Sequence, residues 1–315
     1  MAAIAGVSLK TVSRVVNGQG YVSSETSERV ETAIKKIGYR PNEIARRMRP
    51  GQSSTDIGLL IGDLQNPYFG SVAAAVIAEA NTQGYGVMIS SVDENPERER
   101  HAVEALISRR VAGLLLIAGG DDFSFLASEI DHGTPVVFLD RPAAGLDADE
   151  VLLANESGAR EAVEHLLESG YQRIATIVAS SRHATGERLR GYQTALENAG
   201  ITVDHSLIRL LNKGSVEEAR LAARELLDSD NPPEAFFTTT GFVTLGLLYE
   251  LEGRTDIGVV GFDDLPLADL LPLPITVMSS EPSAVGTLGV RTLFDRLNGD
   301  NSPPKRHLIR PRLIS

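Results

Sequence analysis

Residues 5–17 run Ala-Gly-Val-Ser-Leu-Lys-Thr-Val-Ser-Arg-Val-Val-Asn, which predicts a tight turn followed by a short amphipathic helix. Gly6 gives the turn its backbone freedom, and Ser8 is a candidate N-cap for the helix. One side of the helix carries valines spaced i, i+3 and i+4, namely Val12, Val15 and Val16. The other side carries hydrogen-bond donors, namely Lys10, Thr11, Ser13, Arg14 and Asn17. Such donors suit phosphates and base edges, so the stretch predicts part of a DNA-binding helix-turn-helix, with a solvated surface helix as the alternative.

The pattern around this stretch predicts a small three-helix domain. Residues 2–5 supply a first helix. A third helix, capped by Ser24 and stopped by Gly38, has one apolar face, made of Val30, Ala33, Ile34 and Ile37. Residues 42–49, Asn-Glu-Ile-Ala-Arg-Arg-Met-Arg, then predict a short helix. Isolated helices below about 12 residues are marginal in water, so we expect a partner to order this one, with a charged linker as the alternative.

Length and composition indicate a folded protein of two or three domains. The chain has 315 residues, of which 42% are hydrophobic and 23% charged. It has no cysteine, which excludes disulfides, thiolate metal sites and cysteine nucleophiles. No stretch resembles a signal peptide or a membrane span of about 18 apolar residues, so we expect a cytoplasmic protein with no membrane partner.

Charge is distributed unevenly along the chain. Residues 1–50 contain nine lysines and arginines and four glutamates, a formal charge of +5. Because the whole chain carries −12, the remaining residues carry −17. A polyanion is attracted to the basic end and repelled by the acidic body, which favours DNA contact through the N-terminal region alone.

From residue 56 onward, short apolar runs alternate with amphipathic segments. This order predicts parallel strands buried on both faces, with helices between them, in two doubly wound α/β lobes. For the first lobe we expect strands at 57–61, 86–89, 113–117 and 136–139 and helices at 69–83, 97–110 and 123–132. For the second we expect strands at 174–178, 208–211, 235–237, 257–260 and 275–277 and helices at 155–169, 187–199, 215–228, 242–251 and 283–297, the last of which the family fold described below routes back to the first lobe.

Polar and aromatic residues follow these strands or open the next helix, at the edge where such sheets bind ligands. They are Asn66, Tyr68, Phe69, Asp140, Arg141, Thr185, Arg188 and Asp263. Aromatic rings pack on the C–H faces of a sugar or nucleoside, and carboxylate and guanidinium groups bind its hydroxyl pairs. We therefore expect these residues to bind a small molecule. The alternative is that each is a local cap, salt bridge or core residue.

The N-terminal motif and the segments after it resemble the lactose-repressor/galactose-repressor (LacI/GalR) family of transcriptional regulators. The resemblance implies an all-α helix-turn-helix headpiece with a hinge helix, then an α/β, two-lobed, periplasmic-binding-protein-like body whose chain crosses three times between the lobes. It implies base contacts from Leu9, Lys10 and Arg14, and phosphate contacts from Ser8, Thr11, Ser13 and Asn17. For Leu9, a core role is the alternative. In the hinge helix, Ala45 and Met48 would enter the minor groove, Met48 standing where leucine is usual.

Four features depart from the family pattern. Several more residues normally precede Ala2, so we expect the first helix to lack its first turn. Thr240-Gly241 replaces the Asn-Asp of sugar-binding relatives, and Ser279-Ser280 replaces their glutamine. Lys213-Gly214 stands where purine-responsive relatives place an aromatic residue, which argues against a purine base. A sugar, a nucleoside-like molecule and an anionic effector attracted by Lys213, Arg188 and Arg141 stay open.

Together these observations predict a repressor that binds a palindromic operator on double-stranded DNA as a homodimer and responds to a sugar or nucleoside-like effector. We expect a headpiece at 1–41, a hinge and linker at 42–55 and a body at 56–315, with lobe 1 at 56–154 and 281–298 and lobe 2 at 155–280 and 299–315. No phosphate loop, nucleophile elbow, dinucleotide fingerprint or metal-spaced histidine pair occurs, so we expect no enzyme, cofactor or metal. The alternative is a solute-binding protein of the same body fold with a non-functional headpiece.

Overall fold

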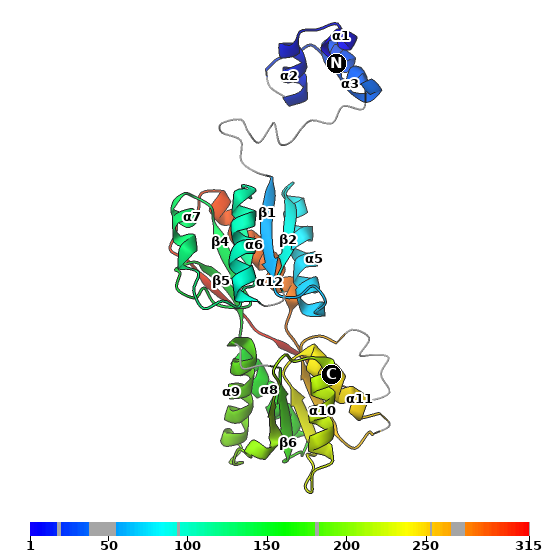
Figure 1. The fold of residues 1–315 in the computed structure, drawn as a ribbon, viewed down its shortest axis with the longest axis vertical. Coiled ribbons are helices and arrows are strands. Elements are labelled where there is room, and N and C mark those ends of the chain that lie inside the picture. Colours follow the sequence, from blue (N-terminus) through cyan, green and yellow to red (C-terminus); the bar gives the residue numbers. More distant parts are fainter. Residues whose placement is uncertain are drawn as a thin grey trace. The chain divides into compact units, whose positions relative to one another are not determined.

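The computed structural model describes residues 1–17, 20–37, 55–92, 95–179, 183–252, 254–265 and 275–314. The chain divides into two compact units, Met1–Ser54 and Thr55–Ser315. Among the described residues, the first unit contains only helices and the second contains both sheets (Figure 1). The predicted hinge helix, with Ala45 and Met48, lies outside the described residues. In the described part of the chain, no helix is long and apolar enough to cross a membrane.

The first unit is a three-helix headpiece, made of α1 (Ala2–Ala5), α2 (Leu9–Asn17) and α3 (Ser24–Ile37). Its buried core consists of Ala5, Val12, Val30 and Ala33, with Val15, Val16 and Ile34 packed against them. Gly6 ends α1 in the left-handed region, with φ of 64°, where a residue with a Cβ would be strained. Arg29 on α3 donates to the carbonyl of Ala5 at 2.6 Å and so ties α3 to this turn. The predicted turn and valine face of the helix-turn-helix are both present.

The first lobe of the second unit is a parallel six-stranded sheet in the order β11-β5-β4-β3-β1-β2. Its strands are β1 (Asp56–Ile61), β2 (Gly86–Ser91), β3 (Leu114–Leu116), β4 (Val136–Leu139), β5 (Asp149–Leu153) and β11 (Arg306–Ile309). On one face pack α5 (Pro67–Thr82) and α12 (Pro282–Leu297). On the other pack α6 (Pro96–Ser108), the 3-10 turn η1 (Ser124–Leu126) and α7 (Ala127–Asp131). Because both faces are covered, the central strands β3 and β4 are wholly apolar.

The second lobe repeats this architecture with the sheet order β12-β10-β9-β8-β6-β7, in which only β12 is antiparallel to its neighbour. Its strands are β6 (Ile174–Val178), β7 (Ile208–Leu210), β8 (Ala235–Thr238), β9 (Gly258–Phe262), β10 (Thr276–Ser279) and β12 (Arg312–Ile314). One face is covered by α8 (Asn155–Glu168) and α9 (His183–Asn198). The other is covered by α10 (Val216–Leu227) and α11 (Gly241–Glu250), while η2 (His205–Leu207) precedes β7.

Helices α8 and α9 lie unusually close together. A Cβ at Gly191 on α9 would overlap the carbonyl oxygen of Glu156 on α8 and come within 2.8 Å of the Cβ of Ala159. Glycine at this position therefore permits the approach, because no side chain has to fit between the helices. The approach also places the first turn of α8 beside the first half of α9, where two polar side chains of the site described below meet.

The chain crosses between the lobes three times: from β5 to α8, from β10 to α12 and from β11 to β12. The prediction that 299–315 belong to the second lobe is wrong for β11. This strand pairs with β5 in the first sheet, where Arg306 forms an ion pair with Glu150 at 2.5 Å. Because α12 packs against the first lobe, the chain that follows it meets the exposed edge of β5 before it returns. Only β12 joins the second sheet.

Candidate functional site

The outward face of α2 carries the residues predicted to contact DNA bases. Leu9, Lys10 and Arg14 are all exposed. Leu9 is 80% exposed, which excludes the alternative of a core role for it. These three side chains therefore lie free on one short helix, as base-edge contacts require, and their contact with DNA stays a prediction.

The residues predicted to contact phosphates lie on or next to the same helix. Ser8 is exposed, and its hydroxyl caps α2 by accepting a hydrogen bond from the Thr11 amide at 3.1 Å. Thr11 and Ser13 are half-buried. Asn17 ends α2, and its side chain lies outside what the structure describes.

One aromatic residue of the headpiece was not predicted as functional. Tyr21, between α2 and α3, is 93% exposed. An aromatic ring this free of packing contributes nothing to the core of the headpiece, since burial is what makes aromatic side chains stabilising. In the sequence, the only sign of this exposure was its position in a glycine-rich connection. Helical periodicity could not indicate it, because a loop residue belongs to no helix face.

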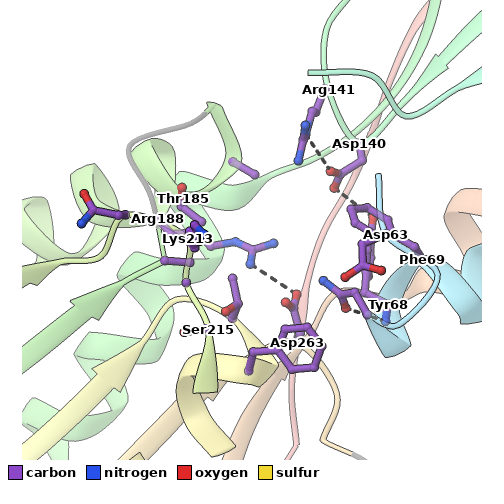
Figure 2. A pocket seen from close by; sticks show the side chains of 17 residues that line it. Asp63, Tyr68, Phe69, Asp140, Arg141, Thr185, Arg188, Lys213, Ser215 and Asp263 are labelled. Carbon is purple, nitrogen blue, oxygen red and sulfur yellow. Dashed lines mark hydrogen bonds and ion pairs between the residues drawn. The ribbon is translucent and has the colours of Figure 1, made fainter. Parts of the chain in front are cut away.

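A cleft of about 580 Å³ lies within the second unit and is lined by both lobes. All eight residues predicted to bind a small molecule line it: Asn66, Tyr68, Phe69, Asp140, Arg141, Thr185, Arg188 and Asp263 (Figure 2). Of the further lining residues, only Lys213 belonged to a predicted alternative, that of an anionic effector. These residues are Asp63, Ala179, Ala184, Asn212, Lys213, Gly214, Ser215, Thr240 and Phe242. Most of these follow a strand or open a helix, so the rule that located the first eight also applies to them.

On the first-lobe side, a tyrosine and an aspartate are buried together. The hydroxyl of Tyr68 donates to Oδ1 of Asp140 at 2.9 Å, and Nε of Arg141 lies 3.8 Å from Oδ2. Asp140 has a positive φ of 65°, which turns the chain sharply after β4. Burial is the largest cause that raises the pKa of Asp140, while Arg141 opposes it. Burial, and then Asp140, raise the pKa of Tyr68 well above its ordinary value, so Tyr68 stays a neutral donor.

We expect Asp140→Asn to remove a pH dependence of stability. Because the folded-state pKa of Asp140 is raised, folding takes up a proton between the ordinary aspartate pKa of about 4 and the raised value. The free energy of unfolding of the wild type should therefore fall, relative to that of D140N, as the pH rises through this window, and the difference should level off above it. Urea denaturation of both proteins across a pH series measures this. A difference that is constant with pH would contradict it.

On the second-lobe side, Arg188 is 4% exposed and makes several contacts at once. Its Nε donates to Oδ1 of Asn155 at 2.9 Å, and Nη1 donates to the carbonyl of Thr239 at 2.7 Å. Its guanidinium lies 3.7 Å from the ring centroid of Phe262, a cation–π contact. Nη1 also lies 3.3 Å from Oδ1 of Asp263. These contacts fix the guanidinium at the wall of the cleft.

Asp263 retains an unused acceptor. Its Oδ1 is buried and within ion-pair distance of Arg188, but it accepts no hydrogen bond from the described residues. Arg188 and Asp263 therefore form an ion pair without a hydrogen bond to this oxygen, at a residue that lines the cleft. Asp263 has a φ of 76°, a strained conformation that non-glycine residues adopt rarely.

Asn155 connects this site to the first crossing between the lobes. It is the first residue of α8, two residues after the end of β5, and is 1% exposed. Its Nδ2 donates to Oε2 of Glu187 at 3.2 Å, and its Oδ1 accepts from Arg188. No role was predicted for Asn155 or Glu187, because their contact depends on the close approach of α8 and α9.

Comparison with known proteins identifies the family. Residues 1–42 match the sequence profile of bacterial regulatory proteins of the lacI family, and residues 163–315 match that of a periplasmic binding protein-like domain. The chain is 33% identical to the ribose operon repressor of Halalkalibacterium halodurans, over 98% of this chain and 93% of the relative. The chain belongs to the LacI family. It is also 32% identical to the HTH-type transcriptional regulator PtxS of Pseudomonas putida, over 100% of this chain and 93% of that one.

A solved LacI-family structure has the same fold. The crystal structure of the Lac repressor dimer bound to operator and the anti-inducer ONPF matches with a TM-score of 0.88 and 28% identity, covering 100% of this chain and 96% of that one. The predicted family and the two-lobed α/β body are thus confirmed. As a LacI-family member the chain is a DNA-binding transcriptional regulator and not an enzyme, as predicted.

Proposed function

We propose that this LacI-family regulator is a cytoplasmic repressor that binds a pseudo-palindromic operator as a homodimer and is controlled by a small effector in the cleft. The observation that carries the effector half of the proposal is the convergence of both lobes on one cleft lined by all eight predicted residues. The DNA half is supported by Leu9, Lys10 and Arg14, which stand exposed on α2. Two symmetry-related headpieces would require a site with two half-sites.

The chemistry of the cleft favours a sugar over a nucleoside. Asp263 offers a carboxylate and Arg188 a fixed guanidinium at the wall of the cleft, which together suit a pair of hydroxyl groups. Tyr68 is 9% exposed and Phe69 4%, and they pack edge to face on each other, with ring centroids 5.4 Å apart. Such rings present little face for a purine to stack on, whereas a sugar needs only their edges and hydroxyl partners.

Exposed apolar side chains on both lobes support the homodimer. Ile77 on α5 and Ile89 on β2 are exposed in the first lobe, and Leu221 on α10 and Tyr249 on α11 are exposed in the second. A homodimer would bury such side chains between two copies of the chain. The Lac repressor relative is itself a dimer.

The lobe crossings give the effector a route to the DNA-binding unit. An effector that contacts Arg188 on one side and Asp140 on the other has a different affinity for open and closed arrangements of the lobes. Asn155 lies at the first crossing between the lobes and accepts a hydrogen bond from Arg188. An effector that moves Arg188 therefore also acts on the segment that connects the lobes. A coupling free energy of about 1–3 kcal/mol would be enough to switch operator occupancy.

Deleting residues 1–54 should separate the two activities. We expect the full-length protein to protect a palindromic site in footprinting, and we expect the deletion variant to lose DNA binding entirely, because α2 is removed. The variant should still be stabilised in a thermal-shift assay by the effector that stabilises the full-length protein, because the cleft lies wholly within Thr55–Ser315. Failure of the full-length protein to select any palindromic DNA would overturn the repressor proposal. DNA binding retained by the deletion variant would do the same.

A further inference from the structure

The charged groups that line the cleft are not all neutralised. Three acidic and three basic residues line it: Asp63, Asp140, Asp263, Arg141, Arg188 and Lys213. Arg188 is engaged by Asp263, and Arg141 lies near Asp140. The side chain of Lys213 forms no ion pair or hydrogen bond with any other residue in the described part of the chain. Lys213 thus presents an exposed, uncompensated positive charge on the second-lobe side of the pocket (Figure 2).

The backbone that carries Lys213 is firmly held. The carboxylate of Glu218 accepts hydrogen bonds from the amides of Lys213 and Gly214, each at 3.0 Å, and it completes a capping box with Ser215. Gly214 has a φ of 69°, and a Cβ there would come within 2.9 Å of the carbonyl oxygen of Ala179. The loop is therefore packed closely against the end of β6, and the backbone of Lys213 is held in place at the cleft.

Lysines are rare in the body of this protein. From residue 55 to the end of the chain, Lys213 and Lys305 are the only lysines, and the other cationic side chains are arginines. Lys305 is paired with Asp300 at 2.8 Å, directly precedes β11 of the first lobe and is not among the residues that line the cleft. The N-caps of α5, α10 and α11, which are Asn66, Ser215 and Thr240, also line the cleft, so the partial positive charges of three helix N-termini lie at its wall.

We propose that the effector carries an anionic group, a carboxylate or a phosphate ester, that pairs with Lys213 while its hydroxyl groups meet Arg188 and Asp263. The inference rests on the proposed function, since it names the chemical class of the same effector. A carboxylate or phosphate gives a strong, charge-assisted hydrogen bond to an ammonium group, and a neutral sugar leaves that group without a partner.

The test compares matched ligands on the full-length protein. Isothermal titration is carried out with glucose, gluconate and glucose 6-phosphate, and with ribose, ribonate and ribose 5-phosphate. An anionic member should bind about 10- to 100-fold more tightly than its neutral parent. Lys213→Met should abolish this preference, and K213R should retain it. Lys305→Met, which removes the only other lysine of the body, is the matched control and should leave the preference intact.

Each outcome has a distinct meaning. A preference for the acid over the phosphate, or the reverse, identifies which anion the cleft accepts. Neutral and anionic members that bind equally, or a preference that survives in K213M, would overturn this inference and leave the proposed function standing. Absence of binding in every series would overturn the proposed function, and this inference with it.

Discussion

Arg188→Met should abolish effector binding and lower the free energy of unfolding of the body by about 3–5 kcal/mol. Arg188 is buried, and its removal leaves Asp263 as a buried carboxylate with no opposite charge within ion-pair distance in the described part of the chain. It also removes donors to the side chain of Asn155 and the carbonyl of Thr239. Methionine retains an apolar contact with Phe262. The loss of stability then reports on the missing charge and hydrogen bonds rather than on a missing side-chain volume. Urea denaturation gives the stability, and titration with an identified effector gives the affinity.

A double-mutant cycle with Asp263→Asn tests the cause. If the unpaired carboxylate dominates the loss, R188M/D263N should be more stable than R188M alone, because the second change removes the uncompensated charge. Both variants should fail to bind effector, since each lacks the guanidinium. Two results would contradict a stabilising role of this ion pair. One is that R188M is as stable as the wild type, and the other is that the double variant is no more stable than R188M.

The sequence predicted the β-sheets well wherever a strand was a continuous apolar run. The strand predicted at 136–139 is β4, and the runs at 57–61 and 174–178 are β1 and β6. Such runs are distinctive because a parallel strand buried on both faces has no polar side. The predicted helix at 187–199 starts four residues earlier in the structure, at His183, since its first turn is polar and lines the cleft.

The strand β5 was missed because it begins with two acids, Asp149 and Glu150. Both are buried, and each pairs with an arginine distant in sequence: Asp149 with Arg296 at 2.7 Å and Glu150 with Arg306. Nothing local to residues 149–153 indicates these partners, so the run resembled a loop. The same cause led to the wrong lobe for β11, whose place is set by its pairing with β5.

The cleft residues could be predicted because the carboxyl ends of parallel strands meet at one edge of a sheet. Their mutual contacts could not. The positions of Arg188 and Asp263 were predicted, but the ion pair between them depends on how α9 lies against β9. Asn155 and Glu187 lie on different helices, and only the glycine-permitted approach of α8 and α9 brings them together. Lys213 was predicted only as a departure from the family pattern and as part of the anionic-effector alternative. That its side chain is unpaired could not be predicted, because pairing of a lysine is a property of the fold.

Arg14→Met should weaken specific operator binding by about 1–3 kcal/mol per half-site, which for two half-sites is roughly 30-fold to 10⁴-fold. Arg14 stands exposed on α2 and makes no core contact that would be lost, so the fold of the headpiece should be unchanged. A guanidinium can bind two acceptors of a guanine at once, and methionine can bind neither. The operator is first selected from random DNA with the wild type, and the affinities for it and for unrelated DNA are then compared.

Lys36→Met is the matched control, because Lys36 is also an exposed cation of the headpiece but lies on α3. Loss of one phosphate-attracting charge weakens binding to all DNA alike and reduces the salt dependence, whereas loss of a base contact weakens binding to the selected site in particular. We therefore expect R14M to reduce the ratio of specific to unrelated binding and K36M to leave that ratio nearly unchanged. If R14M reduced both affinities equally, Arg14 would be a phosphate contact, and base recognition would have to come from Leu9, Lys10 or the exposed Tyr21.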